Sequence, residues 1–335
     1  MKRLIAFLLC AVMMAGILPA PARAGTVTDA DGNEYETDEK GFLITDDDSA
    51  CYILENDEEG LWAYSNNALS IRVERFDEMK KVGKKDRKLI YWIAEVYASE
   101  KEPMTSVGTP ATKKHPIGYR LVNPSAIARD NHCVFAVSDD MYGLRLQKYK
   151  THGLVIRDGE IIATKTNKGS KWPNMDTISL YGDGSMKTHV NQEVTAEEEI
   201  AKGAVHVFCF GPVLISDGTI SPKVLDPKYY PYNEPRVAIG MVEPYHYIIM
   251  CVKGRPTDTY AGVHLDWLAQ KMLDLGCVEA LNLDGGGTVA ITFMGKLLNI
   301  EEKNARSVGS LISFGTDDSI PAKTEDEKNN KNYGK

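Results

Sequence analysis

The stretch that decides the fold lies near the C-terminus and reads Val278-Glu-Ala-Leu-Asn-Leu283, Asp284-Gly285-Gly286-Gly287 and Thr288-Val-Ala-Ile-Thr-Phe-Met294. Two apolar runs flank one carboxylate and three glycines, which predicts a strand, a tight loop and a second strand. A glycine costs about 0.5–1 kcal/mol of backbone entropy in a regular element, so the loop must need what only glycine provides. Without Cβ atoms, its N–H groups can approach a ligand, although an ordinary turn with Asp284 as turn former explains the spacing equally well.

One clear amphipathic helix is expected directly before this stretch, and two short helices are candidates at residues 124–129 and 196–202. The apolar residues of the clear helix follow the i, i+3, i+4, i+7, i+8 spacing of one buried face, and Gly276 ends it. The residues on this face are Leu265, Leu268, Ala269, Met272 and Leu273. Most other segments upstream are short β-branched or aromatic runs, at residues 68–74, 89–97, 133–137, 153–157 and 204–210. The sequence therefore predicts an α+β fold, a strand-rich mixed sheet with few helices, over one domain at residues 61–315.

The two ends of the chain differ from this domain. Residues 1–24 combine a charged start, an apolar run and a small-residue cleavage site, as a secretory signal peptide does. Residues 25–60 form an acidic leader with thirteen acids and one lysine, punctuated by glycine turns that favour a hairpin or two. Residues 316–335 are charged and poor in apolar side chains, so we expect a disordered tail. The protein is therefore expected to be secreted or extracytoplasmic.

Composition limits the partners of the protein. The chain has 39 Lys and Arg against 47 Asp and Glu, and its net charge of -8 becomes -11 once the three basic residues of the signal peptide are removed. An acidic surface disfavours nucleic acid as the main partner. The apolar run at residues 4–18 is shorter than the roughly 20 residues of a membrane span, and no comparable run follows, so we expect no span in the mature chain.

Cysteine and histidine spacing does not predict a metal centre. Five cysteines remain after Cys10, with no C-x-x-C pair, and the seven histidines include no H-x-x-x-H pair. Cys209 and Cys251 lie in apolar runs and are expected in the core, and His206 and His246 lie in apolar strands, either in the core or lining a pocket. The metal ligands stay unknown, and a divalent cation is left open as a cofactor.

Two arginines lie at predicted strand ends, where binding sites are often built. Arg236 opens the run Val237-Ala-Ile-Gly240, and Arg255 follows the run that ends at Val252. A guanidinium binds phosphate or carboxylate through two parallel hydrogen bonds. Taken alone, each arginine is better explained as a surface charge paired with an acid.

Taken together, the motifs resemble the phosphodiester glycosidase family. The resemblance covers roughly residues 89–314 and rests on the order of several segments: Gly153-Leu-Val-Ile-Arg-Asp-Gly159, Phe210-Gly-Pro-Val-Leu-Ile-Ser-Asp-Gly218, Arg236-Val-Ala-Ile-Gly240, Val252-Lys-Gly-Arg255, Gly276 to Thr288, and Arg306-Ser-Val-Gly309. One motif departs from the family pattern. Where the family has Asn-Gly, this chain has Ser138-Asp139, followed by Asp140 and Tyr142. The Asp139 side chain adds bulk and negative charge, which would narrow a pocket for an anionic diester unless it points away or recruits a cation.

The resemblance implies an exported hydrolase that cleaves a sugar-1-phosphate linkage in a cell-envelope or extracellular glycan, with a carbohydrate or phospho-glycan as substrate. It implies Asp284 and Asp140 as the catalytic carboxylates. The groups implied to bind substrate or phosphate are Arg236, Arg255, Arg306, Asn282, Gly285, Gly286, Gly287, Thr288 and Tyr142. The alternative is a catalytically inactive, secreted glycan-binding module of the same fold, in which Ser138 and Asp139 have removed the chemistry.

Overall fold

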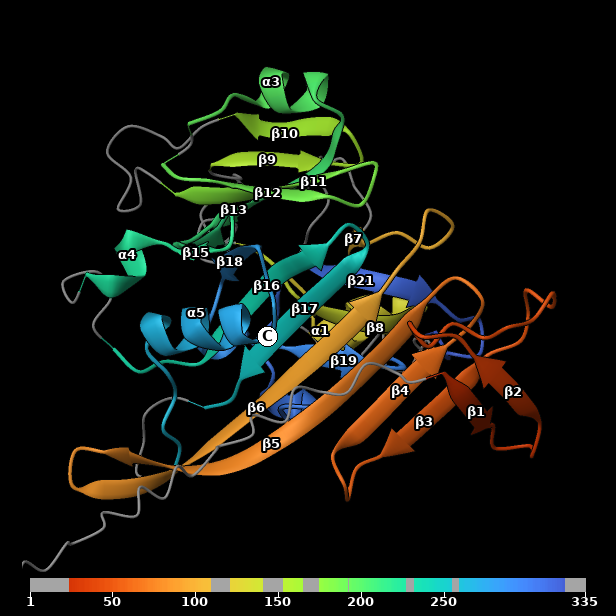
Figure 1. Ribbon diagram of the computed structural model, residues 1–335. Coiled ribbons are helices and arrows are strands. Elements are labelled where there is room, and N and C mark those ends of the chain that lie inside the picture. Colours follow the sequence, from red (N-terminus) through yellow and green to blue (C-terminus); the bar gives the residue numbers. More distant parts are fainter. Residues whose placement is uncertain are drawn as a thin grey trace, which may run out of the picture.

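The computed structural model describes residues 24–109, 121–140, 153–164, 175–191, 193–226, 232–254 and 259–322 (Figure 1). Tyr142 and Arg255 therefore lie outside the described residues. The predicted signal peptide is also outside them except for Ala24, and the predicted tail is outside them except for residues 316–322. No helix in the described ranges is long and apolar enough to cross a membrane.

A nine-stranded sheet forms the body of the molecule (Figure 1). Its order is β15 (Thr219–Ile220), β14 (Val213–Ser216), β18 (Glu279–Leu283), β16 (Arg236–Glu243), β17 (His246–Val252), β6 (Lys85–Tyr97), β5 (Ser70–Val82), β4 (Leu61–Ser65) and β3 (Tyr52–Asn56). Each neighbouring pair is antiparallel. The strand-rich α+β prediction is confirmed, but the described pairings are antiparallel rather than mixed, because many of the strands are joined by short turns.

Two five-stranded sheets complete the domain. One has the order β10 (Glu160–Thr164), β9 (Leu154–Arg157), β13 (Ala204–Phe210), β11 (Asp176–Tyr181) and β12 (Met186–His189). The other has the order β20 (Lys296–Leu297), β19 (Ile291–Phe293), β8 (Cys133–Ser138), β21 (Ser310–Thr316) and β7 (Thr105–Gly108). A separate hairpin joins β1 (Gly25–Thr28) to β2 (Glu34–Thr37).

Helices are few in the described ranges. They are α1 (Pro124–Asp130), α3 (Ala196–Ala201), α4 (Pro222–Leu225) and α5 (Leu265–Asp274), with short 3₁₀ turns at Gly286–Thr288 and Glu302–Asn304. The short candidates at residues 124–129 and 196–202 are confirmed as α1 and α3. The clear amphipathic helix is α5, and Leu265, Leu268, Ala269 and Met272 are buried on its inner face. They pack in one apolar cluster with residues of β6, β14, β16 and β17, so α5 covers one face of the nine-stranded sheet.

The opposite face of this sheet carries the main core. Strand β6 shows the division, because Tyr91 and Ile93 pack on the α5 side while Trp92, Ala94 and Val96 pack in the larger cluster. That cluster also takes buried residues of β8, β13 and β19, among them Phe135, Phe208 and Phe293. Side chains that alternate between two buried faces explain why these strands read as continuous apolar runs.

The predicted domain boundaries fall inside this architecture. The boundary at residues 60 and 61 lies in the β3–β4 hairpin, which belongs to the nine-stranded sheet. The boundary at residues 315 and 316 lies at the end of β21, and Ile320 beyond it is buried, with its carbonyl oxygen 3.0 Å from His132 Nδ1. Ordered contacts therefore extend beyond both boundaries.

Candidate functional site

Two motifs that are far apart in the sequence meet where β8 and β18 end. The backbone N–H of Asp284 donates to the carbonyl of Asp139 at 3.2 Å. Ser138, which replaces the asparagine of the family pattern, is buried, and its Oγ accepts a hydrogen bond from the Ala290 N–H at 3.2 Å. The Ser138 N–H in turn donates to the Ala290 carbonyl. The β8 motif is therefore fixed to both sides of the glycine loop.

The glycine loop lies against the residue before β16. The Gly286 N–H donates to the Pro235 carbonyl at 3.0 Å, with φ at +67° in the left-handed region. A Cβ atom on Gly285 would lie 2.5 Å from that same carbonyl oxygen. Thr288 closes the loop, because its Oγ1 donates to the Gly285 carbonyl at 2.7 Å. Glycine is therefore required here by close backbone approach and by a left-handed turn.

The structure brings two of the three predicted arginines to this loop. A Cβ atom on Gly287 would lie 2.7 Å from Arg306 Cζ, so the guanidinium packs directly on the loop backbone. Arg236 follows Pro235 and is 4% exposed. Its Nη2 donates to the Tyr232 carbonyl at 3.0 Å and its Nε to the Val263 carbonyl at 3.4 Å. Arg255 comes three residues after Val252, the cross-strand partner of Arg236.

Asp140 is held by a residue that the sequence analysis missed. Arg157, at the end of β9, places Nη2 2.9 Å from Asp140 Oδ2, and both side chains are 2% exposed. The Cys209 N–H donates to the same oxygen at 3.0 Å. Arg157 Nη1 donates to the Val207 carbonyl at 2.6 Å, and the guanidinium lies 4.3 Å from the centre of the Phe208 ring. Asp140 is thus a buried carboxylate in an ion pair that joins β8 to the β9–β13 sheet.

The Asp139 carboxylate faces the same buried network. Ser310 Oγ donates to Asp139 Oδ2 at 2.5 Å, and Arg157 Nη2 lies 3.6 Å from that oxygen. The Asp139 residue is 3% exposed. The charge that distinguishes this motif from the family pattern is therefore paired inside the protein and does not project into solvent.

Asn282 connects β18 to the segment that follows β13. It is 1% exposed, and its Nδ2 donates to the Gly211 carbonyl at 2.8 Å. The Gly211 N–H donates back to the Asn282 carbonyl at 3.0 Å, beside the cis peptide bond between Gly211 and Pro212. Among the described residues, the buried Oδ1 of Asn282 has no hydrogen-bond partner. Asn282 therefore orients the strand end that carries Asp284 and retains one acceptor at its side-chain oxygen.

The described charges of the site balance locally. Asp139, Asp140 and Asp284 bring three carboxylates, and Arg157, Arg236 and Arg306 bring three guanidinium groups. Asp284 is partly exposed whereas Asp139 and Asp140 are buried. The described part of the site therefore combines a buried ion-pair network with a partly exposed glycine loop.

Neither Cys209 nor Cys251 is a candidate nucleophile. Both are fully buried, and burial raises the pKa of each thiol far above its ordinary value. The carboxylate of Asp140 adds to this rise at Cys209. The prediction that both cysteines are core residues is confirmed, and the five described cysteines are free thiols.

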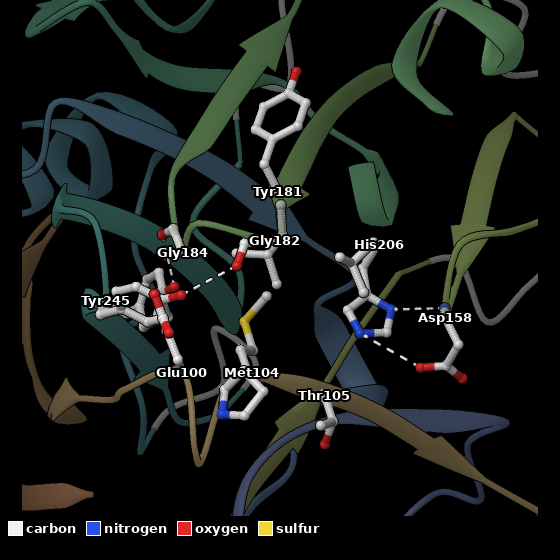
Figure 2. Close-up of a pocket in the computed structure, with 13 residues that line it drawn as sticks. Glu100, Met104, Thr105, Asp158, Tyr181, Gly182, Gly184, His206 and Tyr245 are labelled. Atoms are coloured by element: carbon white, nitrogen blue, oxygen red, sulfur yellow. Dashed lines mark hydrogen bonds and ion pairs between the residues drawn. The ribbon is translucent and has the colours of Figure 1, made fainter. Parts of the chain in front are cut away.

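A separate cavity of about 350 Å³ lies between β7, β11, β13 and β17 (Figure 2). His206 lines it, buried, with its Nδ1 accepting the Asp158 N–H at 3.3 Å. Burial, and then the charge of Arg157, lowers the pKa of His206 to about 3, so the ring is neutral at ordinary pH. His246 Nε2 instead lies 2.9 Å from Glu95 Oε1, and the imidazole ring stacks on the ring of Tyr97. Neither histidine is among the residues that contact the glycine loop.

No metal centre is evident in the part of the chain that the structure describes, where no three His, Cys, Asp or Glu side chains are grouped to hold an ion. The cation next to Asp139 and Asp140 is the guanidinium of Arg157. A divalent cation stays the open alternative that the sequence analysis named.

Comparison with known proteins supports the reading of these motifs. A family model described as phosphodiester glycosidase matches residues 131–314. An uncharacterized SPbeta prophage-derived protein of Bacillus subtilis strain 168, YomE, is 31% identical over 172 residues, which are 50% of this chain and 26% of that protein. The chain therefore spans only about a quarter of that relative's length.

One solved structure shows the same fold, and a second gives a weaker match. The catalytic domain of zebrafish N-acetylglucosamine-1-phosphodiester alpha-N-acetylglucosaminidase, auto-inhibited by its pro-peptide, superposes with a TM-score of 0.58 and 17% identity over 75% of this chain and 84% of that chain. A hypothetical protein from Synechocystis gives a TM-score of 0.49 and 13% identity over 77% of this chain and 64% of its own. Because the family model covers more than half of the sequence, the chain belongs to the phosphodiester glycosidase family of hydrolases.

Proposed function

We propose that this protein is an exported hydrolase that cleaves the sugar-1-phosphate linkage of a glycosyl phosphodiester in a cell-envelope or extracellular glycan. One observation carries the proposal. The loop that follows Asp284 packs against the Arg306 guanidinium at Gly287 and against the backbone of Pro235 and Arg236 at Gly285, so a carboxylate and one exposed guanidinium border the loop and a second, buried arginine begins the adjacent strand. The signal-like pattern of residues 1–24 supports export.

A carboxylate beside arginines suits the cleavage of a glycosyl phosphodiester, in which the sugar becomes cationic and the phosphate becomes more anionic. When the bond between the anomeric carbon and the phosphate oxygen breaks, positive charge develops on the sugar and negative charge on the departing phosphate. Arg236, Arg255 and Arg306 stabilise the phosphate, and a carboxylate stabilises the sugar cation or accepts the proton of the attacking water. Because a phosphate monoester is a good leaving group, strong protonation of its oxygen is not needed.

The two predicted carboxylates take different roles in this proposal. Asp284 is partly exposed at the loop, so it is the group that reaches the sugar. Asp140 is 3% exposed and is paired with Arg157, which holds it in place. Its role is to fix the end of β8, and through Asp139 the backbone of Asp284, by electrostatic and hydrogen-bond contacts.

The glycan-binding module stays the alternative function. The argument for an inactive module was that the Asp139 side chain would place bulk and negative charge in the substrate pocket. The Asp139 carboxylate is instead buried against Ser310 and Arg157, which supports the enzyme over the inactive module.

The proposal is tested with purified residues 25–335 and a synthetic diester of α-N-acetylglucosamine 1-phosphate, by measuring release of the free sugar. We expect release by the wild type and a loss of at least 100-fold in turnover in Asp284→Asn. Asp46→Asn, an exposed carboxylate change elsewhere, serves as the matched control and should retain full activity. Less than a tenfold loss in Asp284→Asn contradicts its assigned role, and sugar binding without release by the wild type favours the binding module.

A further inference from the structure

A β-hairpin extends from the end of the nine-stranded sheet. Strand β17 pairs with β6 as far as Tyr91, which lies opposite Phe76 of β5. Beyond that row, β5 and β6 continue for six further residue pairs, from Asp77 opposite Ile90 to Val82 opposite Lys85. At about 3.3 Å per residue this extension is roughly 20 Å long. Figure 1 shows it projecting from the body of the molecule. We call residues 79–88 the basic arm.

The basic arm leaves the sheet at the end where the candidate site lies. Leu283, the residue before Asp284, pairs with Val237, and its neighbour Arg236 pairs with Val252. Val252 pairs with Tyr91 at the base of the extension. The strands β18, β16, β17 and β6 are adjacent, and three strand spacings of about 4.8 Å place the base of the extension roughly 14 Å from the end of β18.

The charge of the arm is opposite to that of the protein. Residues 79–88 contain six Lys or Arg and one acid, Asp86, in a chain of net charge -8. Lys81, Lys84 and Lys88 are exposed, and they make no ion pair with another described residue. The Nε of Arg87 is buried and has no hydrogen-bond partner within the described residues. Lys81, Lys84 and Lys88 therefore present positive charge to solvent on this arm.

The base of the arm is fixed to the body near the site. Lys80 Nζ donates to Asn233 Oδ1 at 3.3 Å and lies 5.8 Å from the centre of the Trp267 ring. Asn233 is two residues before Pro235, which contacts the glycine loop. The Lys88 N–H and carbonyl also bond to Thr259 and Ala261. These contacts hold the arm in a defined direction relative to the loop.

We propose that the basic arm binds phosphate groups of a polymeric substrate while another linkage of the same chain occupies the site. This inference rests on the proposed function and extends it to the substrate class, a polyanion with repeated phosphodiesters. Charge complementarity selects such a chain, because successive phosphates can meet Lys81, Lys84 and Lys88 together. A small diester fills the site alone and gains nothing from the arm. The arm raises the local concentration of polymer around an otherwise acidic protein.

The test compares a polymer of α-linked N-acetylglucosamine 1-phosphate with the small synthetic diester. Lys81→Glu with Lys84→Glu lowers the net charge of the arm from +5 to +1. Lys40→Glu with Lys101→Glu changes the net charge equally, at exposed lysines outside the arm. We expect the arm variant to raise KM for the polymer roughly tenfold, with kinetics on the small diester unchanged, and the control variant to match the wild type on both. Raising the salt concentration should weaken polymer binding in the wild type and much less in the arm variant.

Binding of the polymer, measured by titration without turnover, separates this inference from the proposed function. Suppose that neither substrate is hydrolysed but the arm variant still binds the polymer tenfold more weakly than the control variant. The proposed hydrolase activity is then wrong, and the proposed polymer binding by the arm is supported. Equal polymer binding by the arm and control variants refutes the role proposed for the arm. An equal loss of kcat/KM on the polymer and on the small diester in the arm variant also refutes it. Preference for duplex DNA or anionic vesicles over the polymer at equal phosphate concentration also overturns it.

Discussion

Replacing Arg157 by glutamine should destabilise the protein more than any exposed ion-pair change. The Arg157 side chain is 2% exposed, and it donates to Asp140 at 2.9 Å and to the Ile156 and Val207 carbonyls. Removing one partner leaves a buried carboxylate without its cation, which costs about 3–5 kcal/mol. By contrast, Arg75→Gln breaks a more exposed pair with Asp77 and should cost less than about 1 kcal/mol.

The assay is urea unfolding of the wild type, Arg157→Gln, Asp140→Asn and the double variant at pH 7.5. We expect the double variant to be at least about 1.5 kcal/mol more stable than the sum of the single changes implies, because the second substitution removes the orphaned charge. The buried ion-pair network would be refuted if Arg157→Gln lowered the free energy of unfolding by less than about 1 kcal/mol and if its effect and that of Asp140→Asn were additive in the double variant.

Three other predictions follow from the contacts of the site and its surroundings. Gly287→Ala forces the Arg306 guanidinium to move by about 1 Å. The kcat/KM for the diester should therefore fall about 10- to 100-fold, with little change in the melting temperature. Unchanged kinetics would show that Arg306 does not bind the phosphate. His206 has a folded-state pKa of about 3, so below pH 6.5 the unfolded chain takes up a proton that the folded chain excludes. The free energy of unfolding should fall by about 2.5 kcal/mol between pH 7 and pH 4.5, and chemical denaturation of His206→Gln should lack this part of the decrease. Because Arg157 already supplies the cation beside Asp139 and Asp140, chelation or added calcium or magnesium should change turnover less than twofold, and a larger effect would contradict that assignment.

Much of the local structure was predictable from the sequence because it depends on side-chain periodicity. The helix α5 follows from the spacing of Leu265, Leu268 and Met272, and β8, β9 and β13 follow from short β-branched runs. The loop after Asp284 was predictable because three successive glycines are costly without a conformational need. The structure shows two such needs, the close approach at Gly285 and the left-handed φ of Gly286.

Long-range pairing was not predictable in the same way. Arg157 ends an apolar run and reads as a surface charge, and only the pairing of β9 with β13 brings it to Asp140. The burial of Asp139 likewise depends on Ser310, which is 171 positions away in the sequence. Strand order decides both contacts, and hydrophobic periodicity carries no information about strand order. The role of the β5–β6 extension was missed for the same reason, since its direction relative to Asp284 depends on the sheet register.

The central claim is that the protein breaks the bond between sugar and phosphate oxygen as a glycosidase, and isotope transfer tests it most directly. Hydrolysis of the diester in water enriched in ¹⁸O, followed by mass spectrometry of both products, reveals which bond water has attacked. The roles given to Asp284, Arg236 and Arg306 predict one ¹⁸O atom on the anomeric carbon of the released sugar and none in the phosphate monoester. Label in the phosphate monoester would show attack at phosphorus and would contradict the account.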